Sequence, residues 1–408
     1  MTVTDLGASP DPALSRGQVS WRDLPAAQQP DWPDPVALAE ATAELGLCPP
    51  LVRANECDRL RGQLAAVARG EALLLQGGDC AETFGGSSQR QVRAKVATLR
   101  QMATVLSAAS GLPVVQVGRI AGQYAKPRSR PTEVRAGVEL PVYRGDSVNG
   151  AEFQPEARIP DPERLKRAYR ASATTLGLIR ELTAEPDREQ LYTSHEALIL
   201  AYESALTRVD ARTGRAYAGS GHMLWIGERT RQLDGAHLAF AAGVDNPLGV
   251  KLGPTATADE ALAVVDRLDP EREPGRLTFI TRMGADRIRD VLPELVDRVT
   301  AAGARVAWVC DPMHGNTFTS PSGHKTRRLH DIADEAEGFL EVHRALGTHP
   351  GGFHLEFTGE HVTECVGGTD EVTVQELRHR YETACDPRLN RGQALDFAFR
   401  VADRYRTG

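Results

Sequence analysis

The sequence predicts an α/β fold, a (β/α)8 TIM barrel with an N-terminal extended and helical arm and an insertion between strands 2 and 3. Eight short apolar runs follow one another from residue 72 onward, and stretches with helical periodicity separate most of them. Strands buried on both faces need not alternate apolar and polar residues, so such runs are typical of a parallel sheet covered by helices. A length of 408 residues also fits a barrel with insertions. A doubly wound open sheet is the alternative.

Each apolar run has the length of a strand and ends in polar or turn-forming residues. The predicted strands are Ala72–Asp79, Pro113–Ile120, Gln190–Glu196, His222–Thr230, Pro247–Pro254, Leu277–Gly284, Val306–Pro312 and Gly352–Glu360. The predicted helices between them are Gln89–Leu106, Glu196–Ala211, Thr257–Leu268, Asp286–Ala302 and Leu329–Leu346. Strand and helix therefore alternate along most of the chain.

The chain is predicted to divide into residues 1–70, an arm with helices that packs on the barrel or on a partner subunit, and residues 71–408, the barrel. Three prolines and two tryptophans in Ser20–Asp34 indicate an extended segment. A helix is predicted over Asp34–Leu45, with Asp34 as its N-cap and a proline at its first position.

The connection between the second and third strands, Ala121–Glu189, is much longer than the others. It contains one clear helical pattern, Pro162–Glu185, and a polar loop. Long connections in a compact domain are usually functional, so this one is interpreted as an insertion that serves the site.

Composition excludes several classes of function. The net charge is -7 and the pI about 5.9, so no basic surplus exists to bind nucleic acid. No run of about 18 apolar residues predicts a membrane span, and Met1–Asp34 does not have the pattern of a signal peptide. The six cysteines are scattered, which favours free thiols and a cytoplasmic location.

Charged or metal-binding side chains end nearly every predicted strand, and active sites of TIM barrels lie at these carboxyl ends. In chain order the residues are Asp79 and Cys80, Arg119, Ser194 to Glu196, Glu228 and Arg229, Lys251, Arg282, Asp311 and His314, and Glu356. A barrel built only for stability would not carry such a set. The pattern therefore predicts a binding or catalytic site at that end.

One group of these residues suits a metal ion. Cys80, His314 and Glu356 offer thiolate, imidazole and carboxylate ligands, a mixture that suits a divalent first-row metal. Asp386, just after a predicted helix, is a candidate fourth ligand. No close spacing supports the set, so the alternatives stay open: Cys80 as a small buried hydrophobic residue and His314 as a turn residue.

A second group is cationic. Arg119, Arg229, Lys251 and Arg282 would repel one another in one pocket unless an anion filled it, and Lys126 and Arg128 lie nearby in the sequence "QYAKPRSR". Guanidinium groups bind phosphate and carboxylate with two parallel hydrogen bonds. The group therefore predicts a substrate with several negative charges. Ordinary salt bridges are the alternative, although too few acids stand at the strand ends to pair with all.

These stretches resemble the type II (plant-like) 3-deoxy-D-arabino-heptulosonate 7-phosphate (DAHP) synthases, in the short form found in secondary-metabolite clusters of the phenazine or ansamycin type. The matching stretches are "WRDLPAAQQPDWPD", "LLLQGGDCAETF", "VGRIAGQYAKPRS", "GDSVNG", "TSHEALILAYE", "WIGERTRQLDGAH", "GVKLGP", "ITRMG", "CDPMHGNT", "GFHLEFTGEHVTEC" and "YETACDPRLN". They run from Trp21 to Asn390 in the expected order.

The resemblance implies a role for each matching position. The implied ligands of one divalent metal ion, Mn2+ or Co2+ with Zn2+ or Fe2+ as alternatives, are Cys80, His314, Glu356 and Asp386. The implied phosphoenolpyruvate contacts are Arg119, Glu228, Arg229, Lys251 and Arg282, and the stretch that binds the aldose phosphate contains Lys126, Arg128 and Ser129. Lys251 is also a candidate catalytic proton relay.

The implied reaction joins phosphoenolpyruvate to D-erythrose 4-phosphate and releases phosphate, the first step of the shikimate pathway to aromatic amino acids. An amino version that uses an imino or amino analogue of the sugar phosphate, as in antibiotic biosynthesis of the ansamycin type, is the first alternative. A non-catalytic barrel that regulates a partner such as chorismate mutase and an unrelated metal-dependent aldolase are the others.

Three further expectations concern control and assembly. Cys385 adjoins the candidate ligand Asp386, so a disulfide between Cys80 and Cys385 is a hypothesis for inactivation when metal is absent. The short arm predicts weak or absent feedback by Phe, Tyr or Trp. The resemblance also implies a homodimer or homotetramer, with a chorismate mutase as a candidate partner.

Overall fold

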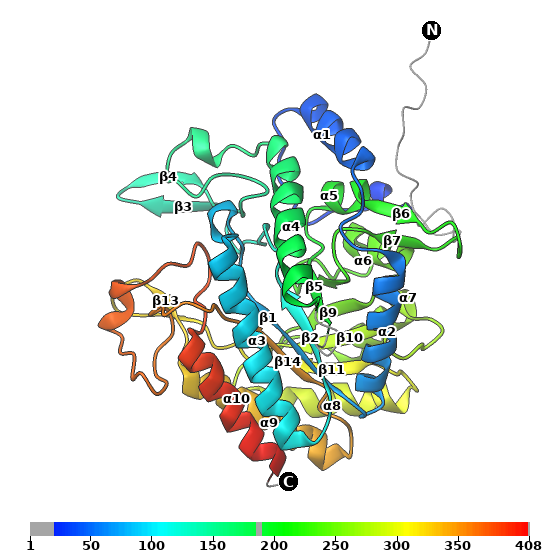
Figure 1. The fold of residues 1–408 in the computed structure, drawn as a ribbon, viewed down its shortest axis with the longest axis vertical. Helices are drawn as coiled ribbons and strands as arrows, with labels where there is room; N and C mark the ends of the chain where they lie inside the picture. The colour runs from blue at the N-terminus through cyan, green and yellow to red at the C-terminus, as the bar shows by residue number, and fades with distance from the viewer. Residues whose placement is uncertain (1–19, 185–189, 407–408) are drawn as a thin grey trace.

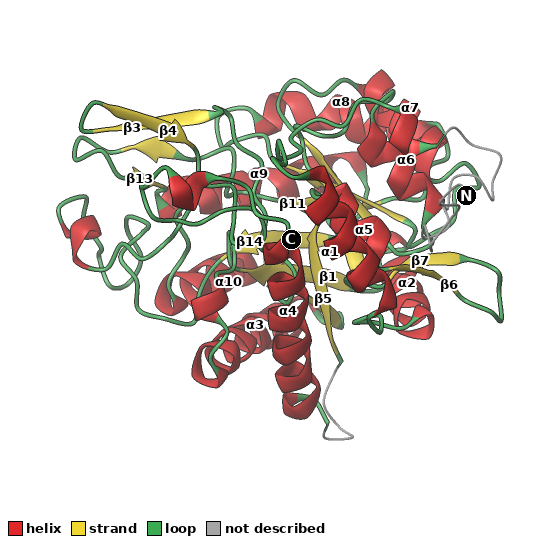
Figure 2. Cartoon of the chain, turned by 90° about the horizontal axis from the view of Figure 1, so that it is seen from above, coloured by secondary structure: helices red, strands yellow, loops and turns green. Residues whose placement is uncertain are grey.

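Eight parallel strands close into a barrel in this computed structural model, which describes residues 20–184 and 190–406 (Figures 1 and 2). They are β1 (Leu73–Gly78), β2 (Val114–Arg119), β5 (Leu191–Glu196), β8 (Met223–Ile226), β9 (Leu248–Leu252), β10 (Leu277–Thr281), β11 (Ala307–Cys310) and β14 (Gly352–Glu356). Closure is complete because β1 pairs with β2 on one side and with β14 on the other. The predicted barrel and its eight strands are confirmed, and the open sheet is excluded.

Helices surround this barrel (Figure 2). They are α3 (Gln89–Ser110), α4 (Glu163–Leu182), α5 (Leu200–Ala205), α6 (Ala236–Gly243), α7 (Ala258–Leu268), α8 (Ile288–Ala301), α9 (Leu329–Leu346) and α10 (Arg391–Arg406). Local signals set their ends. At the start of α3, for example, the Ser88 side chain accepts a hydrogen bond from the Gln91 amide, and Gly111 ends the helix with a φ of 72°.

The helix predicted over Glu196–Ala211 is wrong in its extent. Only the short α5 forms there, and the chain then enters an antiparallel hairpin of β6 (Thr207–Val209) and β7 (Ala216–Ala218). The β-branched residues at both ends of β6 favour an extended chain, and Gly214, with a φ of 68°, suits the tight turn. Helices α6 and α10 were not among the predicted elements.

The long insertion contains a hairpin as well as the predicted helix. Strands β3 (Thr132–Arg135) and β4 (Val138–Pro141) pair antiparallel and extend away from the barrel at the left of Figure 1. Helix α4 follows Pro162, as predicted, while residues 185–189 lie outside the described part. A smaller hairpin of β12 (Phe318–Thr319) and β13 (Lys325–Thr326) precedes α9.

The N-terminal arm contains a 3-10 turn (Trp21–Asp23), α1 (Pro35–Leu47) and α2 (Ala54–Ala68). The N-cap prediction for α1 is confirmed, since the Asp34 carboxylate accepts hydrogen bonds from the first amides of the helix. The Trp21 ring packs edge-on against Phe240 of α6, with ring centroids 6.1 Å apart. The start of the described arm thus packs on an outer helix of the barrel.

Helix α2 closes the amino end of the barrel. Its Leu60, Leu64 and Val67 are fully buried in one cluster with inward-facing side chains of the strands, Leu74 and Val117 among them. No helix in the described ranges is both long and apolar enough to cross a membrane.

Candidate active site

A cleft opens at the carboxyl end of the barrel. Its lining consists of Arg119, Lys126, Pro127, Arg128, Ser129, Glu196, Trp225, Gly227, Glu228, Arg229, Lys251, Arg282, His314, Thr317, Lys325 and Asp386. Seven of these residues are lysine or arginine and three are acidic. Because cations outnumber carboxylates, the cleft favours an anionic ligand even though the whole chain is acidic.

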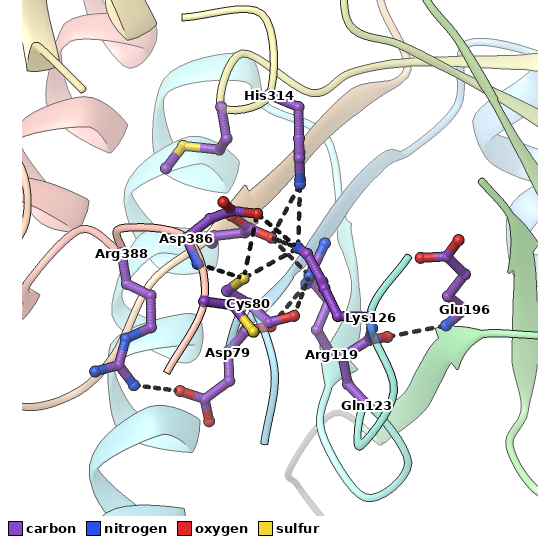
Figure 3. Close-up of polar contacts among 12 residues, drawn as sticks. Asp79, Cys80, Arg119, Gln123, Lys126, Glu196, His314, Asp386 and Arg388 are labelled. Atoms are coloured by element: carbon purple, nitrogen blue, oxygen red, sulfur yellow. Dashed lines mark hydrogen bonds and ion pairs between the residues drawn. The ribbon is translucent and has the colours of Figure 1, made fainter. Parts of the chain in front are cut away.

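The four candidate metal ligands meet at this cleft, and Figure 3 labels three of them, Cys80, His314 and Asp386. Cys80 follows β1, His314 follows β11, Glu356 ends β14 and Asp386 lies in the loop before α10. One ligand atom each from Cys80, Glu356 and Asp386 lies within 4.8 Å of the other two. His314 Nε2 is 3.1 Å from Glu356 Oε1. The fold therefore gathers residues that lie as much as 306 positions apart.

A carboxylate behind His314 holds its imidazole in one orientation. Nδ1 lies 2.7 Å from Asp311 Oδ2, and the same oxygen accepts a 2.7 Å hydrogen bond from Lys251 Nζ. Nε2 is therefore left to face the ligand cluster. Metal-binding histidines are commonly oriented in this way, and a simple turn residue would not need such a partner.

The two carboxylates of the cluster are ionised despite their burial. Burial alone would raise the pKa of Glu356, but His314, Lys126 and Arg327 outweigh it and hold that pKa well below its usual range. Burial also opposes ionisation of Asp386, and Lys126 does most to bring its pKa below the usual range. Cys80 differs, because burial raises the pKa of its thiol well above the ordinary value.

The chemistry of this donor set fits a divalent first-row metal ion. A thiol, an imidazole and two carboxylates are together the mixed soft and hard ligands that such ions accept. Cys80 and Glu356 are fully buried, so these two donors are shielded from water. The thiol would bind as a thiolate, with the bound cation favouring loss of its proton.

The ammonium group of Lys126 lies in the middle of these four ligands. Its Nζ is 3.0 Å from Cys80 Sγ, 3.1 Å from Glu356 Oε1, 3.2 Å from Asp386 Oδ2 and 3.5 Å from His314 Nε2. The lines that converge on it are visible in Figure 3. Lys126, predicted as a contact of the sugar phosphate, thus contacts the metal ligands in this structure.

The candidate phosphoenolpyruvate contacts line the same cleft, and several of them adjoin the ligand cluster. Arg119 at the end of β2 donates a 2.9 Å hydrogen bond to Glu356 Oε1, and its guanidinium lies over the Trp225 ring. Arg282, just past β10, donates to the carbonyl of His314, but its Nε is buried without a hydrogen-bond partner. A buried donor left unpaired costs free energy, so this group is suited to meet an anionic ligand.

The remaining predicted contacts are held by neighbouring loops. Glu228 accepts a 2.7 Å hydrogen bond from the Gly253 amide and pairs with Arg231, so its carboxylate braces the loop after β8. Arg229 Nη2 donates to Ser129 Oγ at 2.6 Å, which joins the two loops at the cleft.

Arg128 reaches two different parts of the chain. Its amide donates a 2.9 Å hydrogen bond to Gln28 Oε1 of the N-terminal arm, and its guanidinium contacts Cys385 Sγ at 3.6 Å. The structure therefore brings every predicted site residue to this one end of the barrel.

Lys251 has a perturbed ionisation. Burial lowers the pKa of its ammonium to about 8, and the neighbouring Asp311 opposes this shift. A lysine whose pKa lies close to neutrality in a cleft is a candidate for proton transfer.

The thiols of Cys80 and Cys385 lie beside one another. A hydrogen bond between them lowers the pKa of Cys385, while burial and then this bond raise the pKa of Cys80. Both cysteines are free in this structure. The predicted proximity is thus present.

Sequence reasoning missed several residues that shape the site. Asp311 and Glu196 lie at predicted strand ends, a position that indicates a site residue. Neither was predicted as a metal ligand or a substrate contact. Trp225 lies inside an apolar run, so its sequence context predicts a core residue. Arg327 Nη1 donates a 2.8 Å hydrogen bond to Glu356 Oε2, and nothing in its local sequence marks it.

Comparison with known proteins places this geometry in a family. A model described as the Class-II DAHP synthetase family matches residues 16–187 and 182–402. The chain belongs to this family. A Streptomyces coelicolor protein named phospho-2-dehydro-3-deoxyheptonate aldolase is 59% identical and aligns over 95% of this chain and 97% of its own length.

A second relative agrees with membership of the class-II DAHP synthetase family, and a solved structure agrees with the fold. A Mycolicibacterium smegmatis protein named phospho-2-dehydro-3-deoxyheptonate aldolase AroG is 47% identical, over 94% of this chain and 93% of its own. A solved structure of the aldolase of the same name from Francisella tularensis SCHU S4 has a TM-score of 0.53 and 12% identity, covering 91% of this chain and 97% of the other. That likeness shows the fold alone. The chain is an enzyme of the DAHP synthase class.

Proposed function

We propose that the enzyme condenses phosphoenolpyruvate with D-erythrose 4-phosphate to give DAHP and phosphate, and that the reaction requires one divalent metal ion, Mn2+ or Co2+ before Zn2+ or Fe2+. Family membership and the names of the relatives support the reaction. The observation that carries the metal requirement is the convergence of a thiol, an imidazole and two carboxylates beside a cationic cleft.

In this proposal the metal ligands are Cys80, His314, Glu356 and Asp386. A divalent ion bound by them would supply Lewis acidity to an aldehyde oxygen. Asp311 keeps His314 Nε2 directed at the cluster, and Arg327 holds the second oxygen of Glu356. These partners fix the ligands before any substrate arrives.

The proposed phosphoenolpyruvate contacts are Arg119, Glu228, Arg229, Lys251 and Arg282. The cations would bind phosphate and carboxylate groups and hold the alkene carbon toward the aldehyde, an effect of orientation. Arg128 and Ser129, with Lys126 once it has left the ligand cluster, would receive the aldose phosphate at the mouth of the cleft. Lys251 is proposed as the proton relay because its pKa is about 8.

The test is consumption of phosphoenolpyruvate by the purified protein loaded with Mn2+, in the presence of erythrose 4-phosphate, with and without EDTA. The proposal expects rapid consumption, equal release of phosphate, and loss of both on chelation. Turnover that survives complete removal of metal would contradict the metal requirement. Turnover only with an amino or imino analogue of the sugar phosphate would replace the substrate assignment.

We also propose that, when no metal is bound, a peroxide oxidant takes two electrons and two protons from the Cys80 and Cys385 thiols, is itself reduced to water, and leaves a disulfide that inactivates the enzyme. The shared hydrogen bond of the two thiols supports this idea. Mass mapping after mild oxidation should find the linked peptides in EDTA-treated protein and not in Mn2+-loaded protein. Two free thiols in the oxidised, EDTA-treated protein would end the proposal.

Three further proposals concern the setting of the enzyme. It is proposed to act in the cytoplasm as a homodimer or homotetramer, to show weak feedback by aromatic amino acids, and to accept a chorismate mutase as a partner. Light scattering measures the molar mass, which gives the oligomeric state and any change in it when chorismate mutase is added. Strong inhibition by Phe, Tyr or Trp in the same assay would refute weak feedback.

A further inference from the structure

The side chain of Lys126 occupies the place toward which the four candidate metal ligands point. Its Nζ lies 3.0 to 3.5 Å from an atom of each ligand, and the residue is only 6% exposed. We propose that Lys126 and the divalent ion alternately occupy the space among Cys80, His314, Glu356 and Asp386, here called the ligand cradle. Metal binding then moves the ammonium group into the substrate cleft. This inference rests on the proposed function, because it concerns the same metal site.

Space and charge exclude joint occupation of the cradle. A divalent ion of this kind lies about 2.0–2.3 Å from its ligands. An ammonium group that stays within 3.5 Å of the same four atoms would then stand next to the ion in a buried site, where like charges repel strongly. Metal binding therefore requires the Lys126 ammonium to leave.

The cradle needs a cation, which explains why Lys126 enters it. The Glu356 carboxylate is fully buried, and an oxygen of the Asp386 carboxylate lies within 4.8 Å of it. A buried carboxylate without a partner is costly, and the Lys126 ammonium pairs with both of these at 3.1 and 3.2 Å. The lysine thus keeps the ligands together and paired until the ion replaces it.

The backbone of Lys126 is anchored while its side chain is not. The amide of Lys126 donates a 2.9 Å hydrogen bond to the Arg144 carbonyl, and the following Pro127 restricts the backbone further. A lysine side chain is a compact charge on a flexible stem of four carbons. Release from the cradle therefore swings the ammonium within the cleft, among the cations predicted to bind an anionic substrate.

The first experiment measures the reactivity of Lys126 in the wild-type protein. Amines are acetylated briefly under native conditions, with Mn2+ or with EDTA, and the rate at each lysine is read by mass mapping. Lys166 is the internal reference, because it is also poorly exposed at 14% but pairs with Glu44 and Glu163 on the outer surface. The inference expects Mn2+ to raise the rate at Lys126 several-fold and to leave that at Lys166 unchanged.

The second experiment compares Mn2+ affinity, measured by competition with a fluorescent chelator, in Lys126→Met and Lys325→Met. Lys325 is the matched control, since its Nζ lies 3.3 Å from Asp386 Oδ1 but its side chain is 50% exposed. Both variants remove one positive charge near the ligands. Only Lys126→Met removes a competing occupant, so it should raise the affinity about tenfold more than the control does.

The outcomes separate this inference from the proposed function. Stoichiometric Mn2+ binding with unchanged Lys126 acetylation, or equal affinities in the two variants, overturns the exchange and leaves the metal site intact. Tight Mn2+ binding by Lys126→Met together with weak Mn2+ binding by the wild type supports the exchange. Failure of both proteins to bind any of Mn2+, Co2+, Zn2+ and Fe2+ overturns the metal requirement itself and the exchange with it.

Discussion

At their amino ends the eight strands surround apolar side chains, and at their carboxyl ends they surround charged ones. Leu74 and Val115 face the interior near the amino end, where Leu64 of α2 joins them. Farther along the same two strands the interior holds Gln76 and then Arg119. One barrel therefore offers hydrophobic burial at one end and buried, paired charge at the other.

The two ends differ in what burial does to free energy. Apolar side chains gain stability when they leave water, and α2 allows the amino end to bury them completely. Buried charges lose hydration, so at the carboxyl end Glu356 has Arg119, Lys126 and Arg327 around it. We infer that the amino end stabilises the fold. At the carboxyl end, buried charges lower the free energy of unfolding but form a site suited to a metal ion and an anion.

The largest effect is expected from Glu356→Gln at the carboxyl end. The neutral amide keeps the shape but removes a charged ligand, so turnover should fall on the order of a thousandfold, the loss of several kcal/mol of transition-state stabilisation. Initial rates with saturating Mn2+ check this. Glu360→Gln, which removes a carboxylate just beyond β14, should stay close to wild type. Equal losses in both variants would mean that Glu356 has no special role.

At the amino end Leu64→Ala should act on stability alone. It leaves a cavity in a fully buried cluster, so the free energy of unfolding should fall by about 2–5 kcal/mol. Denaturant unfolding measures this, with Leu47→Ala as the control because Leu47 is 89% exposed. A fall of less than half a kcal/mol would show that α2 does not seal the barrel.

Arg388→Ala tests whether the carboxyl end depends on its supporting charges. Arg388 joins Asp79, the neighbour of Cys80, to Glu364 at 2.8 and 2.7 Å, and it lies two residues after Asp386. Loss of this bridge should loosen two ligands and weaken Mn2+ binding by roughly 10–100-fold. Chelator competition gives the affinity. The control Arg391→Ala removes an exposed guanidinium nearby, and similar affinities in the two would reject the positioning role.

The smallest expected effect is a pH dependence that comes from outside the site. His343 on α9 is buried beside Phe339, and burial lowers its pKa to about 3. The unfolded chain therefore takes up the proton first, and stability is lost as the pH falls from about 6.5 toward 3. Between pH 7 and 5.5, wild type should lose roughly 1 kcal/mol more than His343→Asn. Parallel stability curves for the two proteins would contradict this origin.

The barrel could be predicted because buried strands require runs of apolar residues, which are visible in the sequence. Each strand is a short apolar run, and each run was found. The hairpin of β6 and β7 was not, because Glu196–Ala211 also has helical spacing and only tertiary packing decides between the two. Helix α10 buries Gln393, three alanines, Phe397 and Val401, so the apolar side of its pattern is weak.

The site was predictable only where function places residues at strand ends. Cys80, His314 and Glu356 stood there, so their types and their places pointed to one site. Asp311 stood there too, but its role behind His314 depends on a distance that no pattern encodes. The position of Lys126 within the ligand cluster depends on the fold of a long insertion, which local sequence does not specify.

The most direct test of this division between the two ends is the rate of phosphate release from phosphoenolpyruvate and erythrose 4-phosphate, measured side by side for Glu356→Gln and Leu64→Ala. Both proteins are assayed with Mn2+ at a temperature at which circular dichroism shows them folded. The division predicts that Leu64→Ala turns over like wild type while Glu356→Gln is nearly inactive. A folded Leu64→Ala that is as inactive as Glu356→Gln would contradict it.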